Sequence, residues 1–157
     1  MKVLIAYVLI LTAALMAPVQ KADVGKLRPI EVIYIGKDSD AVVLKTDTND
    51  IGIGEDVAAA LEDMKRTSPA IIYLDTAKYL LIGPGAQENA MDMQNILKGD
   101  VQLCLAEQQP DLELAAEYLP SHGKMPHFSD WIKGEDLPIL STENDRIKIS
   151  KKDEKSA

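Results

Sequence analysis

Residues 54–83, GEDVAAALEDMKRTSPAIIYLDTAKYLLIG, constrain the fold more than any other part of the chain. The first half has apolar residues at helical spacing, which predicts a helix that has Gly54 as its N-cap. Pro69 ends this helix, because the residue before a proline disfavours helical dihedral angles. The second half contains two apolar runs without alternation, 70–74 and 79–82, closed by the turn signal Gly83-Pro84-Gly85. Such runs predict strands covered on both faces or a buried central hairpin.

The remaining patterns add strands and helices on both sides of this stretch. Alternating or β-branched runs predict further strands at 30–35, 41–46 and 101–106, and one or two edge strands within 137–149. Residues 47–53 are expected only to lead into the helix. Apolar spacing and turn residues predict helices over 87–97, after Asp111 or Gln109, and from Pro126 to Ile132. We therefore expect an α/β (α+β) fold, a mixed sheet of about 4–6 strands with helices packed on it.

The amino terminus resembles an export signal. Lys2 precedes an apolar run from Val3 to Val19 that is interrupted by Thr12 alone. At this length the run fits a signal peptide, cleaved after Ala17 or Ala22, or an uncleaved membrane anchor. The predicted organisation is a signal or anchor helix at 1–22, a linker at 23–29, one domain at 30–149 and a charged tail at 150–157.

Composition limits the function classes. The chain has 157 residues, of which 46% are apolar and 27% charged, as expected of one globular domain. The formal net charge of −8 argues against nucleic-acid binding, which needs a basic surface. Cys104 is the single cysteine and lies in an apolar segment, so we expect a buried and unreactive thiol.

The order of elements over residues 54–119 resembles the N-terminal domain of the Ger(x)C family, the C subunits of spore germinant receptors. The resemblance follows the helix GEDVAAALEDMKRTS, the apolar strands IIYLDTAKYLLIG, the next helix, and VQLCLAEQQPDLELAAEYL. It implies a membrane-side binding or scaffolding domain without catalytic activity, cofactor or transferable site residues. Three features depart from the family: no lipobox cysteine follows the apolar run, the chain has room for one domain, and its sequence shows no membrane-embedded partner.

His122 and His127 are the candidate residues for catalysis or metal binding. Together with Asp130 they could ligate zinc, although structural zinc sites usually have four nitrogen or sulfur ligands. Ser121-His122 and Ser129-Asp130 could be parts of a catalytic triad, but the chain lacks a G-x-S-x-G motif. Exposed loop histidines are the simpler interpretation.

Asp47, Asn49 and Asp50 could contribute oxygen ligands to a calcium site. The run Asp47–Gly52 begins like a calcium loop, but Ala58 stands where an EF-hand has its last glutamate. A turn rich in aspartate and asparagine before the helix is the better interpretation.

Two further patterns have structural explanations. Gly52-Ile53-Gly54 lies before a helix, as in a phosphate-binding loop, but two carboxylates follow it and the third glycine is missing. Phe128, Trp131 and Ile132 could form an exposed docking patch, although aromatic residues at helical spacing are more often part of a core.

The sequence favours a non-enzymatic, extracytoplasmic interaction or assembly module of the envelope or of spore germination, without cofactors. Its partner would be a protein at or outside the cytoplasmic membrane, with membrane contact through residues 1–20 if the signal is uncleaved. Strand addition at the C-terminal edge could provide the interaction. The alternatives are a small extracytoplasmic hydrolase or metal-binding protein using the His122/His127 region, and an ion sensor using the Asp47–Asp50 turn.

Overall fold

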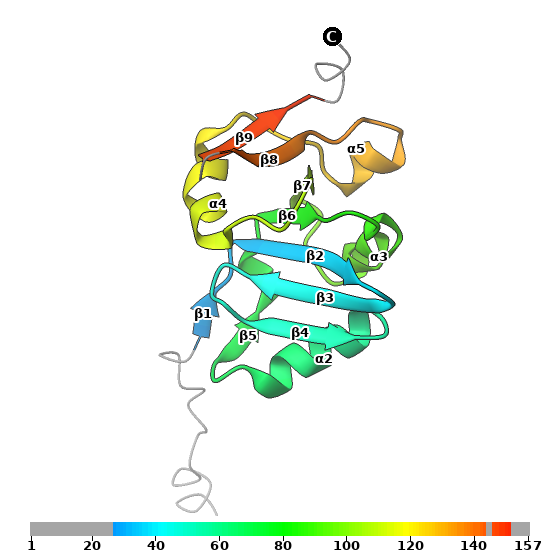
Figure 1. Cartoon of the computed structure of the whole chain (residues 1–157), viewed down its shortest axis with the longest axis vertical. Helices are drawn as coiled ribbons and strands as arrows, with labels where there is room; N and C mark the ends of the chain where they lie inside the picture. The colour runs from blue at the N-terminus through cyan, green and yellow to red at the C-terminus, as the bar shows by residue number, and fades with distance from the viewer. Residues whose placement is uncertain (1–26, 144–145, 152–157) are drawn as a thin grey trace, which may run out of the picture.

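The computed structural model describes residues 27–143 and 146–151. They form an α+β domain around a mixed sheet of seven strands in the order β4-β3-β2-β6-β7-β8-β9. The predicted fold class is confirmed, although the described sheet has more strands than the 4–6 expected. Figure 1 shows the strands running from β4, beside α2, to β9 at the opposite end. The predicted signal or anchor at 1–22 and most of the tail lie outside the described residues.

The four central strands are parallel. They are β2 (Val32–Asp38), β6 (Tyr79–Ile82), β7 (Gln102–Ala106) and β8 (Ile139–Glu143). Antiparallel strands flank them: β3 (Ala41–Thr46) and β4 (Ile51–Gly54) on one side, and β9 (Arg146–Ser150) on the other. All four residues of β6 are buried, as expected of a strand covered on both faces.

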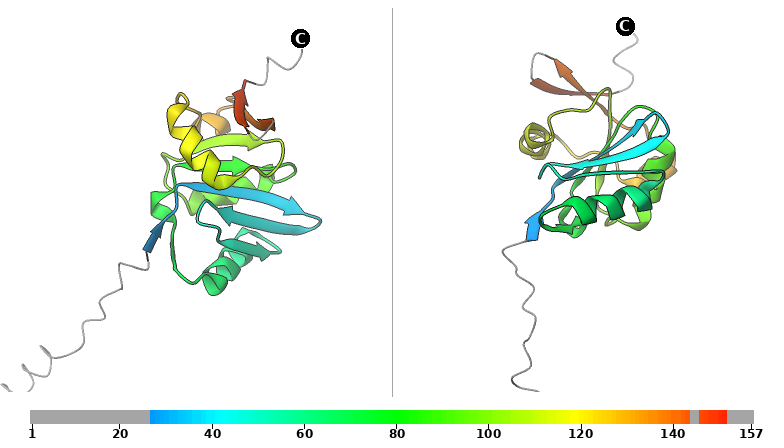
Figure 2. Two further views of the ribbon diagram at one scale, coloured as in Figure 1. Left: turned by 60° about the vertical axis from the view of Figure 1, so that its left-hand side comes forward. Right: turned by 60° about the horizontal axis from the view of Figure 1, so that its bottom comes forward.

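Helices cover both faces of the sheet. One face packs on α2 (Val57–Thr67), on α3 (Gln87–Asp92) with the short 3₁₀ helix η3 (Met93–Asn95), and on α5 (Phe128–Ile132). The other face packs on α4 (Leu112–Tyr118) and the 3₁₀ helix η4 (Leu119–Ser121). The turned views place α4 on the opposite side of the sheet from α2 (Figure 2).

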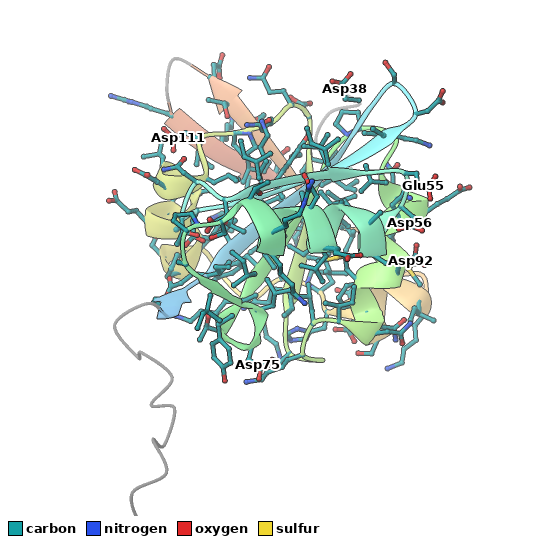
Figure 3. All side chains as sticks on the ribbon, turned by 90° about the horizontal axis from the view of Figure 1, so that it is seen from below. Asp38, Glu55, Asp56, Asp75, Asp92 and Asp111 are labelled. Carbon is teal, nitrogen blue, oxygen red and sulfur yellow. The ribbon has the colours of Figure 1, made fainter. Side chains whose placement is uncertain are left out.

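The central helix is confirmed, but its N-cap is Asp56 and not Gly54. The Asp56 carboxylate accepts a hydrogen bond from the backbone N–H of Ala59 at 2.7 Å, as an N-cap should. Figure 3 shows Asp56 at the start of α2. Gly54 belongs instead to β4, a strand that the sequence analysis missed. Gly52 and Gly54 lie under α2, while Ile51 and Ile53 point to the other face.

The apolar run 70–74 is not a buried strand, and the predicted central hairpin does not form. Its strand β5 (Ile71–Tyr73) pairs in parallel with β1 (Leu27–Pro29) in a separate two-stranded sheet, and the 3₁₀ helix η2 (Leu74–Thr76) follows. Ile71 and Tyr73 are exposed. Residues 27–29, expected to be linker, are thus a strand.

Candidate functional site

The two histidines occupy different environments. His122 is exposed, and its ring stacks on Tyr118 with 5.8 Å between the ring centroids. His127 is half-buried at the N-cap of α5, where its Nδ1 lies 3.1 Å from the carbonyl oxygen of Val101. His127 therefore ties the start of α5 to the residue before β7.

Asp130 has a structural partner on the same helix. Its carboxylate accepts a hydrogen bond from the backbone N–H of His127 at 3.1 Å, and this bond lowers the pKa of Asp130. Pro126 lies just outside the helix, and its carbonyl accepts a hydrogen bond from the N–H of Leu103. These contacts fix α5 against β7. Within residues 27–143 and 146–151, no three histidine, cysteine or acidic side chains group in a way that could hold a metal ion.

The Asp47–Asp50 turn connects β3 to β4. The Asp47 carboxylate accepts hydrogen bonds from the N–H of Glu31 at 3.1 and 3.3 Å, and burial raises the pKa of Asp47. Asp50 is a buried residue, 5% exposed, and its carboxylate accepts a hydrogen bond from the hydroxyl of Thr48 at 2.7 Å. The two carboxylates therefore bond to different donors and stabilise the turn.

Asn49 adopts φ 64°, a left-handed conformation that asparagine tolerates in turns. Its side-chain amide donates to Glu113 of α4 at 2.7 Å. The turn is thus connected to α4 on the other side of the sheet from α2, and the interpretation as an aspartate- and asparagine-rich turn accounts for these contacts.

Two serines and the cysteine complete the candidate residues. The Ser121 hydroxyl donates to the carbonyl of Tyr118 at 2.7 Å, and Ser129 is exposed. Cys104 is 1% exposed, and burial raises the pKa of its thiol to about 12. A thiol with this pKa is almost entirely protonated at neutral pH, so Cys104 is a poor nucleophile.

Several hollows lie on the described part of the chain, and two of them are at opposite ends of the sheet. One, of about 640 Å³, lies beside the ends of β8 and β9 and is lined by His122, Lys124, Glu135, Asp136, Ile149 and Lys151, among others. The other, of about 420 Å³, lies over the face of β3 and β4 that α2 leaves open, with Val43, Ile51 and Ile53 in its lining. Ile51 is 46% exposed and Ile53 is 54% exposed.

The two ends of the sheet also differ in how their strand edges are covered. At β4, the carboxylate of Asp63 on α2 accepts a hydrogen bond from the N–H of Ile53 at 3.1 Å. The hydroxyl of Thr67, which donates to the carbonyl of Asp63 at 2.9 Å, lies 3.3 Å from the carbonyl oxygen of Ile51. At β9, which ends the sheet in Figure 1, no described strand pairs with the outer edge. The sequence indicated a C-terminal edge strand, but it could not show that this edge is the uncovered one.

Comparisons with protein-family models, curated proteins and solved structures found no match to this chain. The resemblance to the Ger(x)C domain therefore stays a prediction. Among the helices of the described residues, none combines the length and the apolar character needed to cross a membrane.

Proposed function

We propose that the chain is an exported, non-enzymatic module that binds another protein at or outside the cytoplasmic membrane. The apolar run from Val3 to Val19 supports export, and the resemblance to the Ger(x)C domain supports a membrane-side role in the envelope or in spore germination. In this proposal the chain acts by binding a partner protein, and it does not catalyse a reaction.

The observation that carries the proposal is the uncovered β9 edge. An edge strand presents backbone N–H and C=O groups that can pair with another chain, and proteins usually block or cover long edges. This domain covers the β4 edge with Asp63 and Thr67 of α2, but leaves β9 open within its described part. Because the β4 edge is covered and the β9 edge is unpaired, we expect a partner protein to bind at the β9 end of the sheet.

The dispersal of the polar candidates supports the same conclusion. Asp47 bonds to the backbone N–H of Glu31 beside the β3–β4 turn, whereas Asp130 and His127 bond to backbone groups at the start of α5. A catalytic site requires nucleophile, base and stabilising groups around one point. The contacts of these three residues form a turn and a helix cap, and these structural roles account for the residues.

The first experiment tests export. The full chain is fused at its C-terminus to alkaline phosphatase, an enzyme that becomes active only outside the reducing cytoplasm, because it needs disulfides. We expect phosphatase activity from the full-length fusion and its loss when residues 1–22 are deleted. Equal activity with and without residues 1–22, at equal fusion levels, would overturn the export part of the proposal.

The second experiment tests binding in cells. A photo-reactive amino acid replaces one residue at a time at Ile53, Ile132 and Lys148, which lie on separate exposed surfaces, and at buried Leu81 as a control. We expect a discrete adduct from at least one exposed position and none from Leu81. If all four positions give no adduct at normal expression levels, the binding role is wrong.

A further inference from the structure

The β8–β9 hairpin extends beyond the sheet that supports it. Five residue pairs join β8 to β9, from Ile139↔Ser150 to Glu143↔Arg146. Two pairs join β8 to β7, Leu105↔Ile139 and Ala106↔Leu140. Residues 141–143 therefore pair with β9 alone, and this half of the hairpin is a two-stranded ribbon. Such ribbons are only marginally stable, and a third strand stabilises them.

The two faces of β9 have opposite chemistry. Ile147 is buried in the cluster under α4, and Ile149 packs partly buried against the same cluster. Arg146 and Lys148 alternate with them and are exposed on the other face. The strand contains no acidic residue, although the whole chain has a formal charge of −8.

The apolar face of β9 is incomplete at the edge of the sheet. Ile149 remains partly exposed because no described strand lies beside it. A strand added at this edge would place its own alternate side chains next to Ile147 and Ile149. Apolar residues there would extend the cluster that contains Leu140 and would remove further apolar surface from water.

The charged face of β9 disfavours pairing with β9 of a second copy of the chain. If two β9 strands paired antiparallel about their centres, Lys148 would lie opposite Lys148. Like charges directly opposite each other destabilise a strand pair, whereas opposite charges stabilise it. The lysine thus discourages self-association and favours an acidic partner.

We propose that the β9 edge binds an extended segment of a partner protein in which acidic and apolar residues alternate. The segment adds an eighth strand to the sheet. Its acidic side chains face Arg146 and Lys148, and its apolar side chains extend the cluster at Ile147 and Ile149. This inference rests on the proposed binding function and identifies its surface and the chemistry of its partner.

The test uses the purified full chain in a mild non-ionic detergent and three fluorescein-labelled seven-residue peptides. One alternates glutamate and valine, one alternates lysine and valine, and one is the glutamate peptide with proline at its centre. Fluorescence anisotropy measures binding. We expect the glutamate peptide to bind, and both others to bind at least about tenfold more weakly, because lysine repels the edge and proline cannot complete the hydrogen-bond ladder.

Two charge variants locate the binding. Lys148→Glu should weaken binding of the glutamate peptide about tenfold and strengthen binding of the lysine peptide. Lys98→Glu makes the same charge change at an exposed position after η3, away from β9, and should leave the affinities within about twofold. No binding of the glutamate peptide, equal binding of the proline peptide, or equal effects of the two variants would each overturn strand addition at β9.

The outcomes separate this inference from the proposed function. Adducts in cells from Ile53 without peptide binding at β9 would leave the binding function standing and remove the β9 site. Peptide binding as expected, together with a phosphatase fusion that stays inactive, would leave the β9 site standing and remove the export role.

Discussion

Replacing Gly52 by alanine should destabilise the domain strongly, because α2 lies directly on the backbone of β4. A Cβ at Gly52 would lie 2.0 Å from the carbonyl oxygen of Ala60 and 2.7 Å from Cβ of Met64. Ordinary contact begins at 3.4 Å, so the helix would have to move by about 1.4 Å. The obstructing atom belongs to the helix backbone, which cannot rotate away as a side chain can. We therefore place the cost at the upper end of overpacking, about 3 kcal/mol.

This cost corresponds to a fall in Tm of about 10 °C for a domain of this size. Urea unfolding followed by the fluorescence of Trp131, which packs against the same core cluster, measures the free energy of unfolding. Gly99→Ala is the matched control, because a Cβ there meets nothing within 4 Å, and its effect should stay within about 0.5 kcal/mol. A loss below about 1 kcal/mol for Gly52→Ala would refute the close helix–strand packing.

Three further predictions follow from the contacts of single residues. Cys104 in the native chain should react with iodoacetamide only after unfolding, because its thiol is buried and its pKa is about 12; rapid labelling of the folded protein at pH 8 would contradict this. Asp63→Asn should lower Tm at pH 7 and reduce the loss of stability on acidification. The hydrogen bond from Arg66 and then that from Ile53 lower the pKa of Asp63, so its stabilisation is present above the ordinary pKa of 3.8 and is lost as the pH falls through the lowered value. If Tm of Asp63→Asn fell on acidification as much as Tm of the native chain, the stabilising role of the Asp63 carboxylate would be wrong. Calcium at millimolar concentration should leave Tm unchanged, because Asp47 already accepts hydrogen bonds from the N–H of Glu31, and a clear increase would indicate a site at this turn.

The central helix could be predicted because its signals agree with its packing. Val57, Ala60, Leu61 and Met64 are the buried residues of α2, as their spacing indicated. The neighbouring strand β4 could not be predicted, because two of its four residues are glycine, which is depleted in strands and common in turns. Its glycines are present because the helix backbone occupies the space of their side chains. This requirement comes from a tertiary contact with α2, so no local sequence pattern indicates it.

The position of each strand in the sheet could not be predicted from the sequence either. The run at 71–73 is as apolar as the run at 79–82, yet β5 pairs with β1 outside the main sheet and β6 lies at its centre. Apolar composition indicates a strand but does not choose its neighbours.

The candidate site residues show likewise that closeness in sequence does not predict which groups a side chain contacts. His122 and His127 are five residues apart in sequence, but one stacks on Tyr118 and the other bonds to the carbonyl of Val101. The turn chemistry of Asp47, Asn49 and Asp50 could be predicted, because these residue types favour local hydrogen bonds. The open β9 edge could not, since it depends on which strand the chain leaves uncovered.

Hydrogen–deuterium exchange of the full chain, with and without the alternating glutamate–valine peptide, tests the binding edge most directly. The account predicts that amides of residues 146–150 exchange at least about fivefold more slowly with the peptide bound, while those of β4 at 51–54 keep their rates, because α2 already covers that edge. Slowed exchange at β4, or no slowing at β9 under saturating peptide, would contradict it.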